Sequence, residues 1–196
     1  GRNTALHTVS AYATASGLCL GQEHTRGKGH EIAAIKALLD TLALKGCIVT
    51  IDAIGCQTEI ARKILDRGGD YLLAVKDNQE TLANALREFF ADGEPRGFGS
   101  LPVSRFQSLE KAHGRIETRQ AMWVTDLSWL DKKLREHWPK LAGLGMIERQ
   151  REINGAVSTE RAYYIGSQGI KSAESFAKAA RDHWGIENSL HWVLDI

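Results

Sequence analysis

The sequence predicts an α/β fold that combines parallel strands, helices and a separate β-rich segment. CIVTIDAIG, residues 47–55, is a continuous apolar run typical of a strand buried on both faces. A helical pattern in residues 56–68 leads to a second such strand, DYLLAVK, residues 70–76. A strand, helix, strand unit of this kind pairs its strands in parallel. Residues 103–165 supply the β-rich segment.

An opening hairpin and a helix precede this unit. Residues 6–25 alternate apolar and small or polar side chains around Ser16 and Gly17, which indicates a β-hairpin. In residues 31–45 the apolar side chains recur at helical spacing, and Gly46 follows as a stop signal. We therefore expect two strands and one helix before the first buried strand.

A further helix is predicted for residues 79–90, and its pattern is interrupted by the Gly, Pro and charged residues of ADGEPRGFGSLP. That stretch predicts a boundary or an insertion point. Residues 103–124 and 146–165 then indicate two hairpins, the second of which turns at Asn154 and Gly155.

Two helices complete the expected elements. DLSWLDKKLREHWPKL, between the two hairpins, predicts a short helix. Ser172 is a suitable N-cap for a closing helix that runs to the end of the chain, with Glu174 in its first turn.

The composition is that of an ordinary soluble globular domain, with 43% hydrophobic and 25% charged residues among 196. The sequence has no apolar run of about 18 residues and no signal-peptide pattern, so we expect a cytoplasmic, non-membrane protein. Its three cysteines lack metal-ligand spacing, which favours a reducing compartment. A net charge of +1 gives no global attraction to nucleic acid, so such a partner would need a local basic patch.

Asp52 is the first candidate functional residue. It lies near the carboxyl end of the first buried strand, and ligands of open α/β sheets gather outside the carboxyl ends of parallel strands. Alternatively, Asp52 caps the following helix or binds turn amides. Asp77 is a competing candidate, although Asp, Asn and Gln in a row are also typical of a solvated turn.

The closing helix carries the second candidate, Glu187. His183, Glu187 and His191 follow one another at four-residue spacing along the border of the apolar face. A glutamate there can be held rigidly while its oxygens face a cleft, as a metal-binding or acid-base role requires. Alternatively, Glu187 is a surface residue between two histidines, with the tryptophans covering the edge of the core. The helical zinc signature H-E-x-x-H, in which two histidines lie four residues apart and the glutamate base directly follows the first, is absent.

Several motifs together resemble a known family. In the family's order, the chain contains ALHTVSAY, TIDAIGCQ, YLLAVKDNQ, KAHGRIETR and HWGIENSLHWVLDI, and these motifs resemble those of the DDE-type insertion-sequence transposases related to the H-repeat-associated proteins. The resemblance covers essentially the whole chain. It implies an RNase H-like (retroviral integrase-like) fold: a mixed sheet flanked by helices, with a β-rich insertion before the last helix.

The resemblance also implies a division of the chain and a metal site. Residues 1–92 and 169–196 correspond to the RNase H-like core, and residues 93–168 to the β-rich insertion. Asp52 matches the second acidic residue of the family and Glu187 the third. Carboxylates suit Mg²⁺ (or Mn²⁺), and two such ions assist in-line attack on a DNA phosphodiester, first by water and then by a 3′ hydroxyl.

The implied partners are DNA, both the terminal inverted repeats and the target, and a possible homo-oligomer. His183 stands where related transposases carry an arginine that holds DNA. The other DNA-contact candidates, each with a structural alternative, are Lys76, Arg115, Trp184, Asn188 and His191.

One departure affects the expected activity. The first catalytic aspartate of the family lies on a strand upstream of the segment that matches ALHTVSAY, and this sequence has no aspartate before Asp40. We therefore expect a piece of a longer bacterial transposase that is inactive by itself. The alternatives are a non-catalytic DNA-binding remnant and an RNase H-like nuclease without strand transfer.

Overall fold

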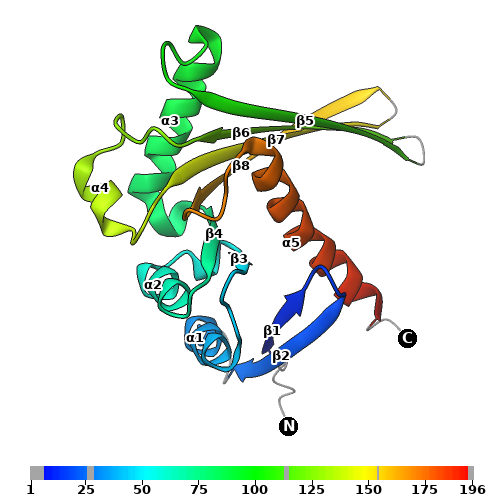
Figure 1. Cartoon of the computed structure of the whole chain (residues 1–196). Helices are drawn as coiled ribbons and strands as arrows, with labels where there is room; N and C mark the ends of the chain where they lie inside the picture. Colours follow the sequence, from blue (N-terminus) through cyan, green and yellow to red (C-terminus); the bar gives the residue numbers. More distant parts are fainter. Residues whose placement is uncertain (1–6, 26–28, 113–114, 154, 194–196) are drawn as a thin grey trace.

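A six-stranded mixed sheet organises the chain (Figure 1). The computed structural model describes residues 7–25, 29–112, 115–153 and 155–193, with the side chains of residues 7, 112, 115 and 185–193 outside the description. The strand order is β3–β4–β8–β7–β6–β5. Only β3 and β4 are parallel, and each other neighbouring pair is antiparallel. The strand bounds are β3 (Ile48–Ile51), β4 (Asp70–Val75), β5 (Val103–Ala112), β6 (Arg115–Val124), β7 (Gly143–Ile153) and β8 (Ala156–Gly166).

The predicted strand, helix, strand unit is confirmed. Helix α2 (Thr58–Asp66) connects β3 to β4, and the parallel register pairs Ile48 with Asp70. Tyr71, Leu72 and Leu73 of β4 are buried because this strand lies between β3 and β8.

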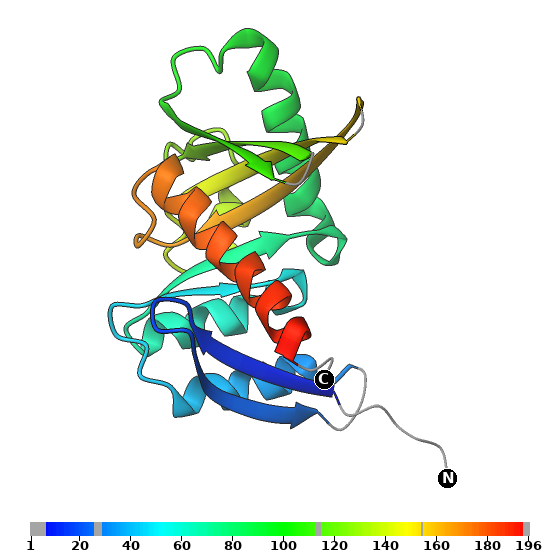
Figure 2. The ribbon, with the colours of Figure 1, turned by 90° about the vertical axis from the view of Figure 1, so that its right-hand side faces the viewer.

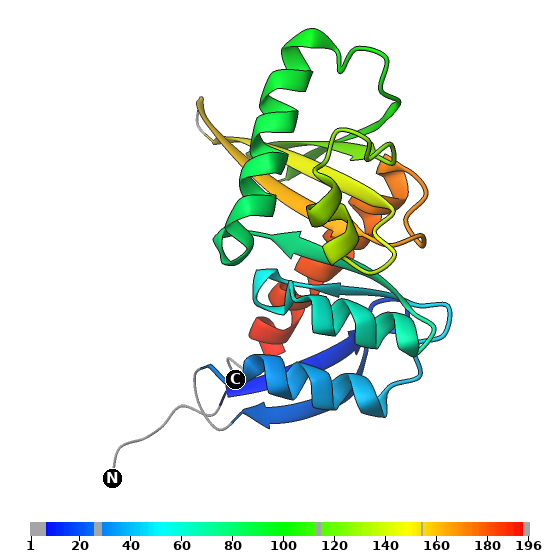
Figure 3. The same cartoon turned by 90° about the vertical axis from the view of Figure 1, so that its left-hand side faces the viewer.

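The opening hairpin is also confirmed, as β1 (His7–Ala13) and β2 (Leu18–Thr25), and forms a sheet of its own. Helix α1 (Glu31–Thr41) follows but ends earlier than expected, because Leu42 takes an extended conformation. Figures 2 and 3 show this hairpin and α1 side by side at one end of the molecule.

Helix α3 (Glu80–Arg96) continues through the stretch where a break was predicted after residue 90, so that expectation was wrong. Pro95 lies in the last turn, where it has no amide hydrogen to donate to the preceding turn. Gly97 then adopts a left-handed conformation, and the amides of Gly97 and Phe98 bond to the carbonyls of Glu94 and Gly93, which is a Schellman ending. Phe98 is buried in the core and fixes this ending.

Both later hairpins are confirmed as β5–β6 and β7–β8. The short helix α4 (Lys132–His137) begins after Asp131, whose carboxylate accepts hydrogen bonds from the amides of Lys133 and Leu134. Helix α5 (Ala173–Val193) begins after Ser172, whose hydroxyl accepts a hydrogen bond from the Ser175 amide as predicted.

Helices cover both faces of the sheet. Helices α1 to α4 lie on the side seen in Figure 3, and α5 crosses the opposite side from β5 and β6 toward the β1–β2 hairpin (Figures 1 and 2). Phe176 of α5 packs on Trp123 and Tyr164 of the sheet. Gly145 makes room for this packing, since a side chain there would overlap the rings of Phe176 and Trp123.

Strands β5 to β8, from the segment expected to be an insertion, join β3 and β4 in one continuous sheet through the β4–β8 pair. The division of the chain at residues 92 and 168 stays a prediction. Within the described ranges, no helix is both long and apolar enough to cross a membrane.

Candidate active site

Asp52 directly follows β3 and is exposed. The backbone of Asp52 is extended, with φ −65° and ψ 179°. Asp52 precedes a short 3₁₀ turn, Ala53–Gly55. Its carboxylate makes no capping hydrogen bond to that turn, so the capping alternative finds no support. Its oxygens are therefore accessible at the carboxyl end of a parallel strand.

Side chains of the segment after β4 form hydrogen bonds to the loop that follows Asp52. The Nδ2 of Asn78 donates a hydrogen bond of 2.7 Å to the carbonyl of Ala53, and the Nε2 of Gln79 donates one of 2.9 Å to the carbonyl of Cys56. The polar run in VKDNQ thus includes two amides that fix the position of the Asp52 loop.

Gly55 ends the turn in a buried position. A Cβ at residue 55 would overlap the Cγ2 of Ile51, the last residue of β3. A larger residue at position 55 would therefore force the loop or the Ile51 side chain to shift.

Asp77, the competing candidate, forms an ion pair with Arg87, in which the Oδ1 of Asp77 lies 2.6 Å from the Nη2 of Arg87. The hydrogen bond that Arg87 donates to the Asp77 carboxylate raises the pKa of the Arg87 guanidinium. Lys76 is exposed next to it, just after β4. Because β3 and β4 are parallel neighbours, Lys76 and Asp52 leave the sheet at the same edge.

A side-chain hydrogen bond joins α5 to β3. The Nδ1 of His183 lies 3.2 Å from the Oγ1 of Thr50, two residues before Asp52. Both side chains are partly buried. Helix α5 is therefore attached to the strand that leads into the candidate carboxylate.

The other predicted residues are distributed as follows. Trp184 turns to another side of α5, where its ring lies 4.4 Å from the Arg149 guanidinium. The backbones of Glu187, Asn188 and His191 continue α5, and Arg115 begins β6, but the side chains of these four lie outside the described residues. In the described part of the chain, no three His, Cys, Asp or Glu side chains form a metal-binding group.

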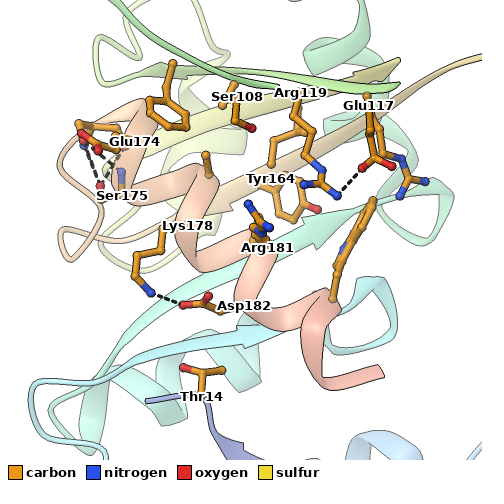
Figure 4. Close-up of a pocket in the computed structure, with 18 of the residues that line it drawn as sticks. Thr14, Ser108, Glu117, Arg119, Tyr164, Glu174, Ser175, Lys178, Arg181 and Asp182 are labelled. Carbon is orange, nitrogen blue, oxygen red and sulfur yellow. Dashed lines mark hydrogen bonds and ion pairs between the residues drawn. The ribbon is translucent and has the colours of Figure 1, made fainter. Parts of the chain in front are cut away.

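The structure adds a groove that the sequence analysis missed. It has a volume of about 1110 Å³ and lies between α5, the β1–β2 turn and the sheet face formed by β5 to β8 (Figure 4). Five basic and three acidic side chains line it, and Arg119, Arg149, Arg151 and Arg181 are among them. The alternate positions of Arg149 and Arg151 on one strand were the available sequence signal.

Comparisons with known proteins agree with the resemblance in the sequence. Residues 2–196 match the family described as the Transposase DDE domain. "Putative transposase YncI" of Escherichia coli O157:H7 is 41% identical over 198 residues, covering 100% of this chain and 50% of that protein. "H repeat-associated putative transposase YhhI" of Escherichia coli K12 is 40% identical over 199 residues, covering 100% of this chain and 51% of that protein. No solved structure matches the chain.

The chain belongs to the DDE transposase domain family. Its mixed α/β architecture, with helices on both faces of a six-stranded sheet, is consistent with that family. The chain spans about half the length of the curated relatives named above.

Proposed function

We propose that the chain carries two catalytic carboxylates, Asp52 and Glu187, of an enzyme that cuts and joins DNA phosphodiesters. The observation that supports this best is the Thr50–His183 hydrogen bond, which attaches the helix bearing Glu187 to the strand that ends at Asp52. Successive helical residues turn by about 100°, so position 187 falls on the same side of α5 as position 183. Positions 52 and 187 thus belong to two segments that contact each other.

The donor chemistry suits a divalent cation. Asp52 is exposed and forms no cap bond, so its hard oxygen atoms are accessible to Mg²⁺ or Mn²⁺. When bound, such ions activate the attacking oxygen and stabilise the leaving oxygen. Asp52 and Glu187 would hold them, and the Asn78 and Gln79 amides would keep the Asp52 loop in position.

The reaction then needs no covalent enzyme intermediate. Water attacks the phosphodiester at an element end, and the freed 3′ hydroxyl attacks the target strand in line. We infer an RNase H-like core for residues 1–92 and 169–196, with residues 93–168 as its β-rich insertion. The proposed partners are inverted-repeat and target DNA in the bacterial cytoplasm, with a homo-oligomer as the working form.

The DNA-contact proposals change in one respect. His183 is bonded to Thr50, so we assign it first to holding α5 in place. Lys76 leaves the sheet at the same edge as Asp52 and remains a phosphate-contact candidate. Trp184, Arg115, Asn188 and His191 stay proposed DNA contacts, each with a structural role as the alternative.

A nicking and strand-transfer assay on the intact protein tests this proposal. Asp52→Asn and Glu187→Gln should each abolish Mg²⁺- or Mn²⁺-dependent cleavage of DNA that carries the element ends, while both variants stay folded. Asp77→Asn, at an aspartate paired with Arg87, is the matched control and should retain activity.

Other outcomes would identify a different function. Full cleavage by Glu187→Gln would refute the assignment of Glu187. Cleavage without any joined product would indicate a nuclease that lacks strand transfer. Binding of the inverted repeats that survives chelation and loss of Glu187, without any cleavage by the unchanged protein, would indicate a DNA-binding module.

A further inference from the structure

Two adjacent rows of mostly charged residues lie on the sheet face on which α5 packs, beside the apolar contacts of that helix. In the register of the sheet, Ser108, Arg119, Arg149 and Glu160 form one row across β5, β6, β7 and β8. The next row on the same face contains Glu110, Glu117, Arg151 and Ser158. Because alternate residues of a strand share a face, three arginines and their carboxylates lie together on the floor of the groove.

Buried contacts fix the arginines of this floor. Glu117 has only 2% of its side chain exposed and pairs with both Arg119 and Arg151, the latter at 2.9 Å. Arg149 pairs with Glu160, and its guanidinium lies 4.4 Å from the Trp184 ring. The buried Nε of Arg149 has no hydrogen-bond partner among the described residues. These contacts therefore fix the orientation of the guanidinium groups on the floor of the groove.

A fourth arginine comes from the helix. Arg181 of α5 is 57% exposed and forms an ion pair with Glu110. Glu110 also forms an ion pair of 3.3 Å with Arg119. Figure 4 shows Arg181 projecting from α5 toward the sheet beside Arg119 and Glu117, with Thr14 of the β1–β2 turn across the groove. Helix α5 and the β1–β2 turn thus form the walls of the groove, and the sheet forms its floor.

We propose that this groove binds the sugar-phosphate backbone of a DNA strand, with Arg151 and Arg181 as direct phosphate contacts. The inference rests on the proposed function only in naming DNA as the polymer. Guanidinium groups bind phosphate through paired N–H donors, and Arg151 and Arg181 are 36% and 57% exposed at the groove although each is paired with a carboxylate. Arg151 uses its Nε for Glu117, and 36% of its side chain stays exposed.

Glu110 has a defined part in this proposal. Its carboxylate holds Arg181 and Arg119 together, and a phosphate entering the groove competes with that carboxylate for Arg181. Glu110 therefore keeps Arg181 positioned in the free protein and weakens DNA binding. Loss of its charge should have the opposite effect from loss of the arginine.

Binding of a duplex of random sequence to the intact protein, measured by fluorescence anisotropy in EDTA, tests the groove without catalysis. Arg181→Gln and Arg151→Gln should each weaken binding roughly tenfold and reduce the slope of log K against log salt by about 1. Arg181→Lys should retain most of the slope, and Glu110→Gln should bind more tightly. Arg96→Gln, at an exposed arginine of α3 outside the groove, is the matched control and should bind normally.

Unchanged affinity and slope in both arginine variants, with folding verified by circular dichroism, would overturn the proposal. So would weaker binding by Glu110→Gln, since the ion pairs would then serve only to hold the fold. Groove-dependent binding of poly-glutamate in place of DNA would show that an acidic protein segment occupies the site. Cleavage of DNA by Glu187→Gln would refute the proposed catalytic role of Glu187 and leave the groove proposal standing. The anisotropy measurement in EDTA does not depend on catalysis.

Discussion

The Oγ1 of Thr50 and the Nδ1 of His183 lie 3.2 Å apart, although 133 residues separate them in the sequence. Thr50 is the third residue of β3, and His183 lies at the middle of α5. This hydrogen bond joins the two segments that carry the proposed catalytic carboxylates. Its strength should therefore influence both stability and the position of α5.

Thr50→Val removes the hydroxyl and keeps the shape of the side chain. We expect a loss of about 1 kcal/mol in the free energy of unfolding, because a partly buried histidine nitrogen loses its partner. Urea unfolding measures this loss. Thr125→Val, at an exposed threonine, is the matched control and should change stability by less than about 0.5 kcal/mol. Equal effects of the two substitutions would show that the bond contributes nothing.

Gly55→Ala should destabilise the turn after Asp52. The new Cβ would overlap the Ile51 Cγ2 in a buried position, and overpacking of this kind costs about 1–3 kcal/mol. Ile51→Ala removes the obstructing methyl group. Thermal unfolding of the two single variants and the double variant should therefore show that the two losses are less than additive. Simple additivity would contradict a steric origin.

Periodicity predicted most of the helices and strands because their local patterns agree with the tertiary structure. The parallel β3–β4 pair follows from two apolar runs joined by a helical segment, and Ser172 fulfils its predicted capping role. The end of α3 was missed because Phe98, beyond the helix, packs into the core and draws the preceding turn into helical conformation. That packing depends on tertiary neighbours and leaves no periodic signal in the sequence.

The candidate site was only partly accessible from sequence. The position of Asp52 after an apolar run indicated a strand end, and the structure places it there, exposed. The contact of His183 with Thr50 could not be foreseen, since it depends on the path of α5 across the sheet. The groove arginines were missed because β6, β7 and α5 each contribute to the cluster, which only the sheet register brings together.

Glu117→Gln should destabilise the sheet around the groove. Glu117 is 2% exposed and serves two guanidinium groups, so loss of its charge leaves Arg119 and Arg151 without their shared counter-ion. Because both arginines retain some exposure, we expect a loss of about 2 kcal/mol, below the range for fully buried pairs. Glu160→Gln, at a glutamate 65% exposed, should cost less than about 1 kcal/mol. Urea unfolding compares the two, and equal losses would refute the importance of burial.

Cys56 should make stability depend on pH in the alkaline range. Burial raises the pKa of its thiol from 9.0 to about 12, whereas the thiol of the unfolded chain keeps its ordinary value. Below pH 9 both states hold the proton, so the thiol adds no pH dependence. Between pH 9 and 12 only the unfolded state releases it, which lowers stability by roughly 1.4 kcal/mol per pH unit.

Comparison of variants isolates this effect from other groups that titrate at high pH. Urea unfolding at pH 7.5 and pH 10 should show a smaller decline in stability for Cys56→Ala than for the unchanged protein, by about 1 kcal/mol. Cys47→Ala, at an exposed cysteine, should decline in parallel with the unchanged protein. If Cys56→Ala also declines in parallel, the buried thiol does not hold its proton as burial requires.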